Sequence, residues 1–196
     1  KQVSLNLHSD GADNSKGFKD YSKYSHIVSD SGGIINSTDR PRSNSSFKFS
    51  SGILEIESHQ SLDLGTSAFT IEFDINFSTL TGSQQILSKV ANNSSNGWHI
   101  IHDDQSENRL RFVLVDSNNN LLKELKSNKD QFTTNRWYHV AIARKPCDST
   151  AVLFIDGDIV DSTSLAEFNL TNSNNLLIGK PIQEWVALGH NDFNGY

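Results

Sequence analysis

The chain has 196 residues but contains no methionine, one cysteine, three prolines and no long apolar run. Because a single thiol, Cys147, cannot form an intramolecular disulfide, no such bond stabilises the fold. The apolar runs span only a handful of residues, far short of the roughly 20 that a membrane-spanning helix needs. A chain of this length can bury a sizeable core without disulfides or metal. We therefore expect one self-sufficient domain over residues 1–196, with no membrane span.

Clustered positive charge is also missing. The formal net charge is -6, and the 17 lysines and arginines are scattered along the chain. Binding to nucleic acid depends on grouped basic residues that neutralise phosphates. The composition therefore argues against a nucleic-acid partner.

Short apolar segments with a period of two fill most of the sequence. In "TIEFDINFS" (70–78), Ile71, Phe73, Ile75 and Phe77 fall on one face of an extended chain, and the polar residues fall on the other. No sustained 3.6-residue period replaces this pattern. Strands are predicted at 3–8, 26–35, 47–49, 53–57, 69–77, 86–90, 98–102, 110–115, 121–125, 137–143, 152–155, 159–161 and 175–178.

Turn residues separate these segments. Asp156-Gly157-Asp158 lies between two apolar runs, and Asp-Gly supplies the positive φ angles of a tight hairpin. The asparagine triplet at 118–120 marks a second hairpin. Many short antiparallel strands joined by such turns predict an all-β fold, an antiparallel two-sheet β-sandwich or jelly roll.

Five segments in order carry a family resemblance. They are "VSLNLHSDGADNSKGFKDYS" (3–22), "SSFKFSSGILEIESHQSLDLGTSAFTIEFDINF" (45–77), "RWYHVAIAR" (136–144), "LFIDGDIV" (153–160) and "LLIGK" (176–180). The chain resembles the laminin-G-like, concanavalin A-like jelly-roll family, in the version found in phage tail and other virion proteins. The resemblance implies a module on a virion or other extracellular surface. Its expected partners are glycans or neighbouring virion proteins, and it can form an oligomer within a larger assembly.

One departure concerns the end of the chain. Related domains run on from a segment like "FNGY" (193–196) into a final strand beside the first strand. Without that strand, the neighbouring strand would expose unpaired N–H and C=O groups. We therefore expect the natural polypeptide to continue beyond Tyr196, or a partner chain to fill the gap.

An enzymatic alternative rests on Glu72 and Asp74. Jelly-roll glucanases carry a Glu-x-Asp motif with a second glutamate on the same strand, and a retaining glycosidase needs two carboxyl groups about 5 to 5.5 Å apart. Here the next residue on that face is Asn76, whose amide cannot act as the proton donor. We therefore predict no catalytic residues, and a non-catalytic module rather than a jelly-roll glycoside hydrolase. A purely architectural capsid or tail protein is the third possibility.

Three aspartates among turn residues near the N-terminus, Asp10, Asp13 and Asp20, are candidate Ca²⁺ ligands. Ca²⁺ takes six to eight hard oxygen ligands, which a loop of this kind can supply. The resemblance assigns Asp10 and Asp20 to a structural Ca²⁺ and places a third ligand beyond Tyr196. Ordinary Asx-turns are the alternative.

The candidate ligand-binding residues are aromatic or imidazole side chains next to turns, where binding residues concentrate on sandwich folds: Trp185, Trp98, His190 and Tyr24. Two other histidines, His99 and His102, lie three apart in a predicted strand and should face opposite sides. That arrangement disfavours their chelating one metal ion.

Overall fold

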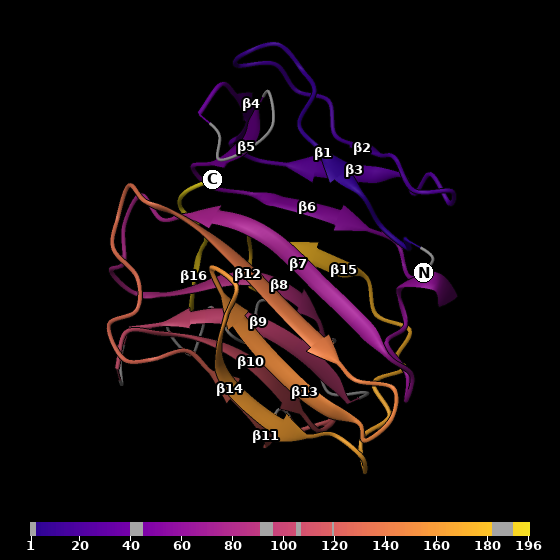
Figure 1. Ribbon diagram of the computed structural model, residues 1–196. Coiled ribbons are helices and arrows are strands. Elements are labelled where there is room, and N and C mark those ends of the chain that lie inside the picture. The colour runs from indigo at the N-terminus through magenta and orange to yellow at the C-terminus, as the bar shows by residue number, and fades with distance from the viewer. Residues whose placement is uncertain (1–2, 40–44, 91–95, 105–106, 119, 182–189) are drawn as a thin grey trace.

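The computed structural model describes the whole chain except residues 1–2, 40–44, 91–95, 105–106, 119 and 182–189. Two β-sheets lie face to face, and short strands from the N-terminal region cover one end (Figure 1). The fold is an antiparallel β-sandwich, as the sequence predicts. Among the described residues, no helix has the length and apolar character of a membrane span.

The larger sheet has the order β11-β10-β9-β8-β15-β6-β3, and β16 lies parallel to β8. Its strands are β3 (Val28–Ser31), β6 (Ile53–Ile56), β8 (Ser83–Lys89), β9 (Gly97–Asp103), β10 (Arg109–Val115), β11 (Leu121–Lys126), β15 (Leu176–Ile178) and β16 (His190–Asp192).

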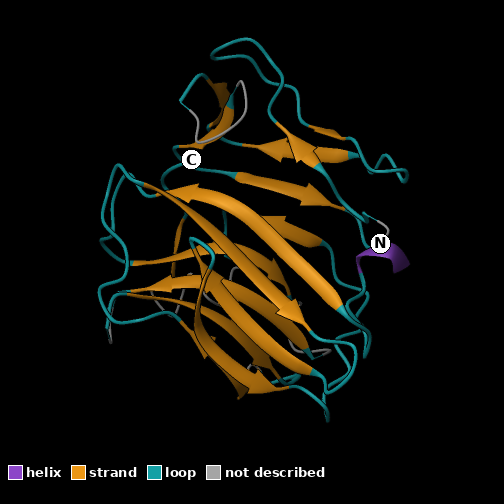
Figure 2. Cartoon of the chain, viewed as in Figure 1, coloured by secondary structure: helices purple, strands orange, loops and turns teal. Residues whose placement is uncertain are grey.

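The smaller sheet has the order β14-β13-β12-β7. Its strands are β7 (Phe69–Asn76), β12 (Trp137–Arg144), β13 (Thr150–Ile155) and β14 (Asp158–Ser164). Two short ladders complete the fold, pairing β1 (Leu7–His8) with β2 (Lys19–Asp20) and β4 (Ile34–Ser37) with β5 (Ser46–Phe49). One 3-10 turn in the described chain, η1 (Gln60–Leu62), lies between β6 and β7 in the sequence (Figure 2).

The core lies between the two sheets, and the alternation in β7 leads into it. Ile75 and Phe77 are buried, Ile71 and Phe73 pack against the same cluster, and Glu72 is exposed. The larger sheet contributes Leu54, Ile56, Ile100, Leu110 and Phe112 to this core. The period of two therefore predicts correctly which face of β7 is buried.

The single strand expected over 26–35 is wrong. The structure divides it into β3, which pairs with β6, and β4, which pairs with β5. Gly32 and Gly52 lie at this break, both with a φ of 106°, and a Cβ on Gly32 would lie 2.6 Å from the Cα of Gly52. Only glycine allows both this φ and this close approach, so the chain changes ladder there.

The predicted Asp-Gly hairpin is confirmed. Asp156 and Gly157 have φ angles of 54° and 91°, and they join β13 to β14. The Asp156 carboxylate also accepts the backbone N–H of His139 at 2.8 Å and a hydrogen bond from Arg136 at 3.1 Å. These contacts tie the turn to β12.

The C-terminal residues lie between two ladders. Gly195 exchanges backbone hydrogen bonds with Phe49, and Tyr196 exchanges them with Asn76, at distances of 2.8 to 3.0 Å. The antiparallel pairing with Asn76 places residues 195–196 beside the end of β7.

Candidate functional site

The four predicted ligand residues do not form one site in the described chain. Trp185 lies outside the described residues. The expectation that Trp98 is available to a ligand is wrong. The residue is only 3% exposed, and its ring packs on Phe112 at a centroid distance of 5.9 Å. Inward alternation in β9 turns this ring into the core, so it offers no face to a ligand.

His190 lies in β16, on the opposite side of the larger sheet from the core, near His99 and Arg111. Burial, followed by the charges of His190 and Arg111, holds the pKa of His99 well below its ordinary value. Burial also lowers the pKa of His190, although Asp103 acts in the other direction. His102 faces the core instead, with its ring 5.0 Å from that of Phe77, so the prediction of opposite faces is confirmed. A role for His190 in ligand binding stays a prediction.

Tyr24 belongs to a group of three rings, Tyr24, His26 and His59, which we call the ring cluster. The Tyr24 ring lies 5.6 Å from His26 in a stacked arrangement and 5.3 Å from His59. The two imidazoles are 5.1 Å apart. Tyr24 therefore belongs to a side-chain group that the sequence did not reveal, since His59 is distant in the chain.

The three predicted calcium ligands make other contacts. Asp10 accepts a hydrogen bond from the Tyr21 hydroxyl, which raises the pKa of that phenol. Asp13 accepts the backbone N–H of Thr38 at 3.2 Å. In the described part of the chain, no three His, Cys, Asp or Glu side chains group as a metal site would require. As placed, these carboxylates do not form a joint ligand set, and calcium binding stays a prediction.

Asp20 is the best satisfied of the three aspartates. It is buried, and its two oxygens accept the backbone N–H groups of Asn6, Ser22 and His26 and the Ser22 hydroxyl, at 2.7 to 2.9 Å. Burial alone would raise the pKa of Asp20, but these hydrogen bonds outweigh it and hold the pKa below its ordinary value. The carboxylate therefore ties residue 6 to the segment that carries Tyr24 and His26.

We expect Asp20→Asn to lower the free energy of unfolding by about 2 kcal/mol or more, because an amide NH₂ would face N–H and O–H donors. Urea denaturation at pH 7 measures this, and Asp13→Asn, at an exposed aspartate, is the matched control. The Asp20 effect should be the same in EDTA and in millimolar Ca²⁺. A loss seen only with Ca²⁺ would instead make Asp20 a calcium ligand.

The carboxylates of the enzymatic alternative lie on the outer face of the smaller sheet. Glu72 is exposed opposite Ala141, and Asp74 is opposite His139. Asn76 is buried and its backbone pairs with Tyr196. The residue that follows Asp74 on this strand face is Asn76, so β7 lacks the second glutamate of the jelly-roll glucanase motif.

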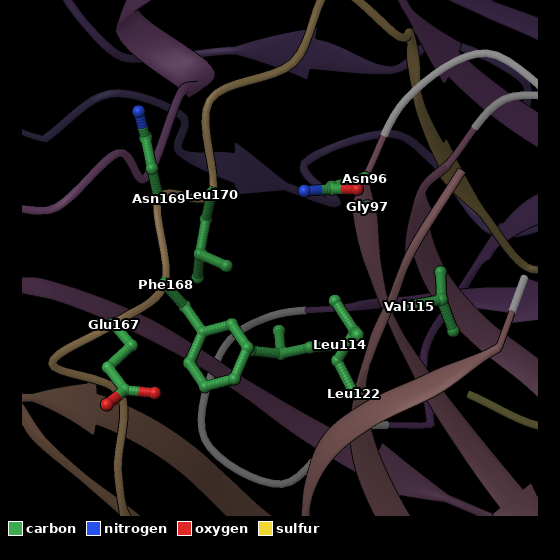
Figure 3. A pocket seen from close by; sticks show the side chains of 9 residues that line it. All are labelled: Asn96, Gly97, Leu114, Val115, Leu122, Glu167, Phe168, Asn169 and Leu170. Atoms are coloured by element: carbon green, nitrogen blue, oxygen red, sulfur yellow. The ribbon is translucent and has the colours of Figure 1, made fainter. Parts of the chain in front are cut away.

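A pocket of about 200 Å³ opens at one end of the sandwich. We call it the end pocket, and its lining comes from the start of β9, the end of β10, β11 and the segment after β14: Asn96, Gly97, Leu114, Val115, Leu122, Glu167, Phe168, Asn169 and Leu170. The Phe168 ring lies toward Leu114 and Leu122, and the amide of Asn96 extends into the space opposite Leu170 (Figure 3). Glu167 and Asn169 lie at the rim.

A buried arginine holds one wall of this pocket. The guanidinium of Arg144 donates to the carbonyls of Leu165, Phe168 and Gly65 at 2.8, 3.1 and 3.2 Å. Burial lowers the pKa of Arg144. Three carbonyls surround the cation and fix the backbone that carries Phe168. This contact could not be predicted from the sequence, in which Arg144 is only the last residue of an apolar strand.

Comparison with known proteins agrees with this sandwich. Residues 50–196 match the family described as the Concanavalin A-like lectin/glucanases superfamily. The chain belongs to this superfamily, which confirms the resemblance to laminin-G-like, concanavalin A-like jelly rolls. No protein of curated function matches the chain.

Solved structures share the fold at low sequence identity. The binding domain of botulinum neurotoxin serotype G superposes with a TM-score of 0.62 at 18% identity, over 90% of this chain and 46% of that chain. Domain 4 of AbnA, an extracellular arabinanase from Geobacillus stearothermophilus solved with arabinotriose, gives 0.61 at 11% identity, over 87% and 78%. A putative carbohydrate binding protein from Bacteroides ovatus gives 0.57 at 15%, over 91% and 48%. The chain thus spans less than half the length of the neurotoxin domain.

Proposed function

We propose that this domain is a non-catalytic carbohydrate-binding module and that the end pocket holds one sugar unit of a glycan. The observation that carries the proposal is the lining of that pocket. The Phe168 ring and two leucines offer an apolar wall for the C–H face of a sugar, and Asn96 offers amide groups for hydroxyls. A small concave site with few polar groups suits a small ligand.

Two of the structurally similar proteins support carbohydrate binding. The arabinanase domain was solved with arabinotriose, and the Bacteroides ovatus protein is described as a putative carbohydrate binding protein. Strand β7 supports binding without catalysis, because Asn76 stands where the glucanase motif has its second glutamate.

We propose an extracellular or virion surface as the setting, the virion version resting on the five segments that resemble phage and virion domains. In that setting the module would hold a glycan on one side and neighbouring proteins on the other. A purely architectural role predicts a different result: no glycan bound, together with oligomers that survive dilution.

A glycan array followed by calorimetric titration of the best ligand tests the proposal. We expect Asn96→Ala to weaken binding about five- to thirtyfold, because one or two hydrogen bonds from an exposed amide are lost. Phe168→Ala should weaken it further through loss of the stacking surface. Ile159→Ala, an exposed apolar residue at the far end of β14, is the matched control and should leave affinity unchanged.

Two outcomes would contradict the proposal. An affinity that Asn96→Ala and Phe168→Ala both leave unchanged would move the ligand away from the end pocket. Turnover of a polysaccharide that disappears in Glu72→Gln would make the protein an enzyme. Since Phe168 also packs against the core, its thermal melt must be recorded alongside, and exposed Asn96 provides the test that is independent of folding.

A further inference from the structure

The imidazoles of the ring cluster converge on one hydroxyl. His26 Nε2 lies 3.0 Å from the Oγ of Ser61, and His59 Nδ1 lies 2.9 Å from the same atom. His26 is on the segment between β2 and β3, whereas His59 is the N-cap residue of η1. Two ring nitrogens from separate segments therefore point at a single position near the surface, where His59 is exposed and His26 is half-buried.

The hydrogen bonds define which nitrogen of His59 carries the ring proton. His59 Nδ1 accepts the backbone N–H of Ser61 at 3.1 Å, so this nitrogen carries a lone pair and the ring proton is on Nε2. The Ser61 hydroxyl then donates to His59 Nδ1 and accepts from His26 Nε2–H. In the other tautomer of His26 the proton lies on Nδ1, and the lone pair of His26 Nε2 is then directed at the same position as that of His59 Nδ1.

We propose that His26 and His59 form a two-histidine site for a divalent transition metal ion of the Cu²⁺, Ni²⁺ or Zn²⁺ type. Neutral imidazole suits these ions. Their bonds to imidazole nitrogen are about 2.0–2.1 Å, shorter than the 3.0 and 2.9 Å that now separate the two nitrogens from Ser61 Oγ, so both rings must approach the ion. The Ser61 hydroxyl, which now lies between the two nitrogens, rotates away when the ion binds, and water completes the coordination.

The surroundings favour a weak, accessible site. The buried carboxylate of Asp20 accepts the backbone N–H of His26 at 2.8 Å, which fixes that segment and places a negative charge near the ligand. The Lys23 ammonium lies over the Tyr24 ring, 4.8 Å from its centroid, and opposes a cation there. Two protein ligands without a carboxylate in the coordination sphere predict micromolar affinity for Cu²⁺ or Ni²⁺ and none for Ca²⁺, which prefers oxygen.

The test uses the full chain, prepared without a histidine tag and stripped with EDTA. Titration calorimetry with Ni²⁺ and electron paramagnetic resonance with Cu²⁺ should show one equivalent bound and two nitrogen ligands. His26→Gln and His59→Gln should each weaken binding about tenfold or more and leave a single imidazole nitrogen in the Cu²⁺ spectrum. His8→Gln is the matched control, since His8 contacts a tyrosine ring rather than another imidazole, and its spectrum should equal that of the wild type.

Equal affinity and an unchanged nitrogen count in His26→Gln would overturn the proposal, as would binding that His8→Gln abolishes. His59 also caps η1, so a folding defect can weaken its variant. His26 donates only its backbone N–H to Asp20, a contact that His26→Gln keeps, and this variant decides the result even if the other melts early.

Discussion

Lys89→Ala should lower the free energy of unfolding by about 3 kcal/mol or more, because it leaves the partly exposed Asp63 without its counter-charge and the buried Asn172 acceptors without a donor. Lys89 is completely buried at the end of β8. Its ammonium donates to Asp63 at 2.9 Å, to the Asn172 carbonyl at 2.5 Å and to the Asn172 side chain at 3.1 Å. All three ammonium protons have acceptors, so the side chain joins β8, the end of η1 and the segment before β15.

Three further variants separate charge from packing: Lys89→Met, Asp63→Asn and the double variant. Lys89→Met keeps most of the apolar stem and should cost less than Lys89→Ala. In the Lys89→Met/Asp63→Asn double variant, the loss should fall below the sum of the single losses, because neither charge is then unpaired. Chemical denaturation measures the wild type, Lys89→Ala, Lys89→Met, Asp63→Asn and the double variant. A Lys89→Ala variant as stable as the wild type would mean that the pair contributes nothing net.

The sequence predicts most strands because their signal is local. The alternation in β7 and the Asp156-Gly157 turn depend on neighbouring residues, and both are confirmed. The two-residue strand β2 and the strand β16 escape prediction. Each exists only because of a partner elsewhere in the chain: β2 pairs with β1, and β16 lies beside β8.

The candidate sites were much harder to predict. The end pocket joins residues such as Asn96, Leu122 and Phe168, which share no motif and meet only when two hairpin ends and one loop come together. The ring cluster joins His26 to His59 in the same way. Trp98 was wrongly predicted as a binding residue. Its position next to a turn-rich segment suggested exposure, but its side chain lies on the face of β9 that packs into the core.

Mild acid should destabilise the domain well before its carboxylates titrate. Burial lowers the pKa values of His99, His102 and His190 below that of a free histidine. His102 shows the cause most clearly: its Nε2 lies 2.6 Å from Asn108 Oδ1, while its Nδ1 is buried without a hydrogen-bond partner in the described chain. A proton on Nδ1 would put a charge among the rings of Phe77 and Phe132.

The sign follows from linkage. A histidine whose folded pKa lies below its unfolded value of about 6.5 binds its proton more readily in the unfolded chain. Its contribution to stability is therefore complete above about pH 6.5 and is lost as the pH falls below that value. Each such group removes up to about 1.4 kcal/mol per pH unit over the interval between its unfolded and folded pKa values. The hydrogen-bonded Asp20, whose pKa is lowered, titrates below this window.

Urea denaturation at pH 7.5, 6.5, 5.5 and 5.0 measures this loss. We expect His102→Gln, a neutral residue at the same position, to be less stable than the wild type at pH 7.5 but to show a smaller loss on acidification. Exposed His8→Gln should follow the wild-type slope. A stability that stays level from pH 7.5 to 5.0 would mean that the buried rings take up protons in the folded state, which requires water or an acceptor to reach His102 Nδ1. If instead the wild type loses stability on acidification and His102→Gln loses less per pH unit, part of the acid sensitivity lies at the His102 ring, which faces the core.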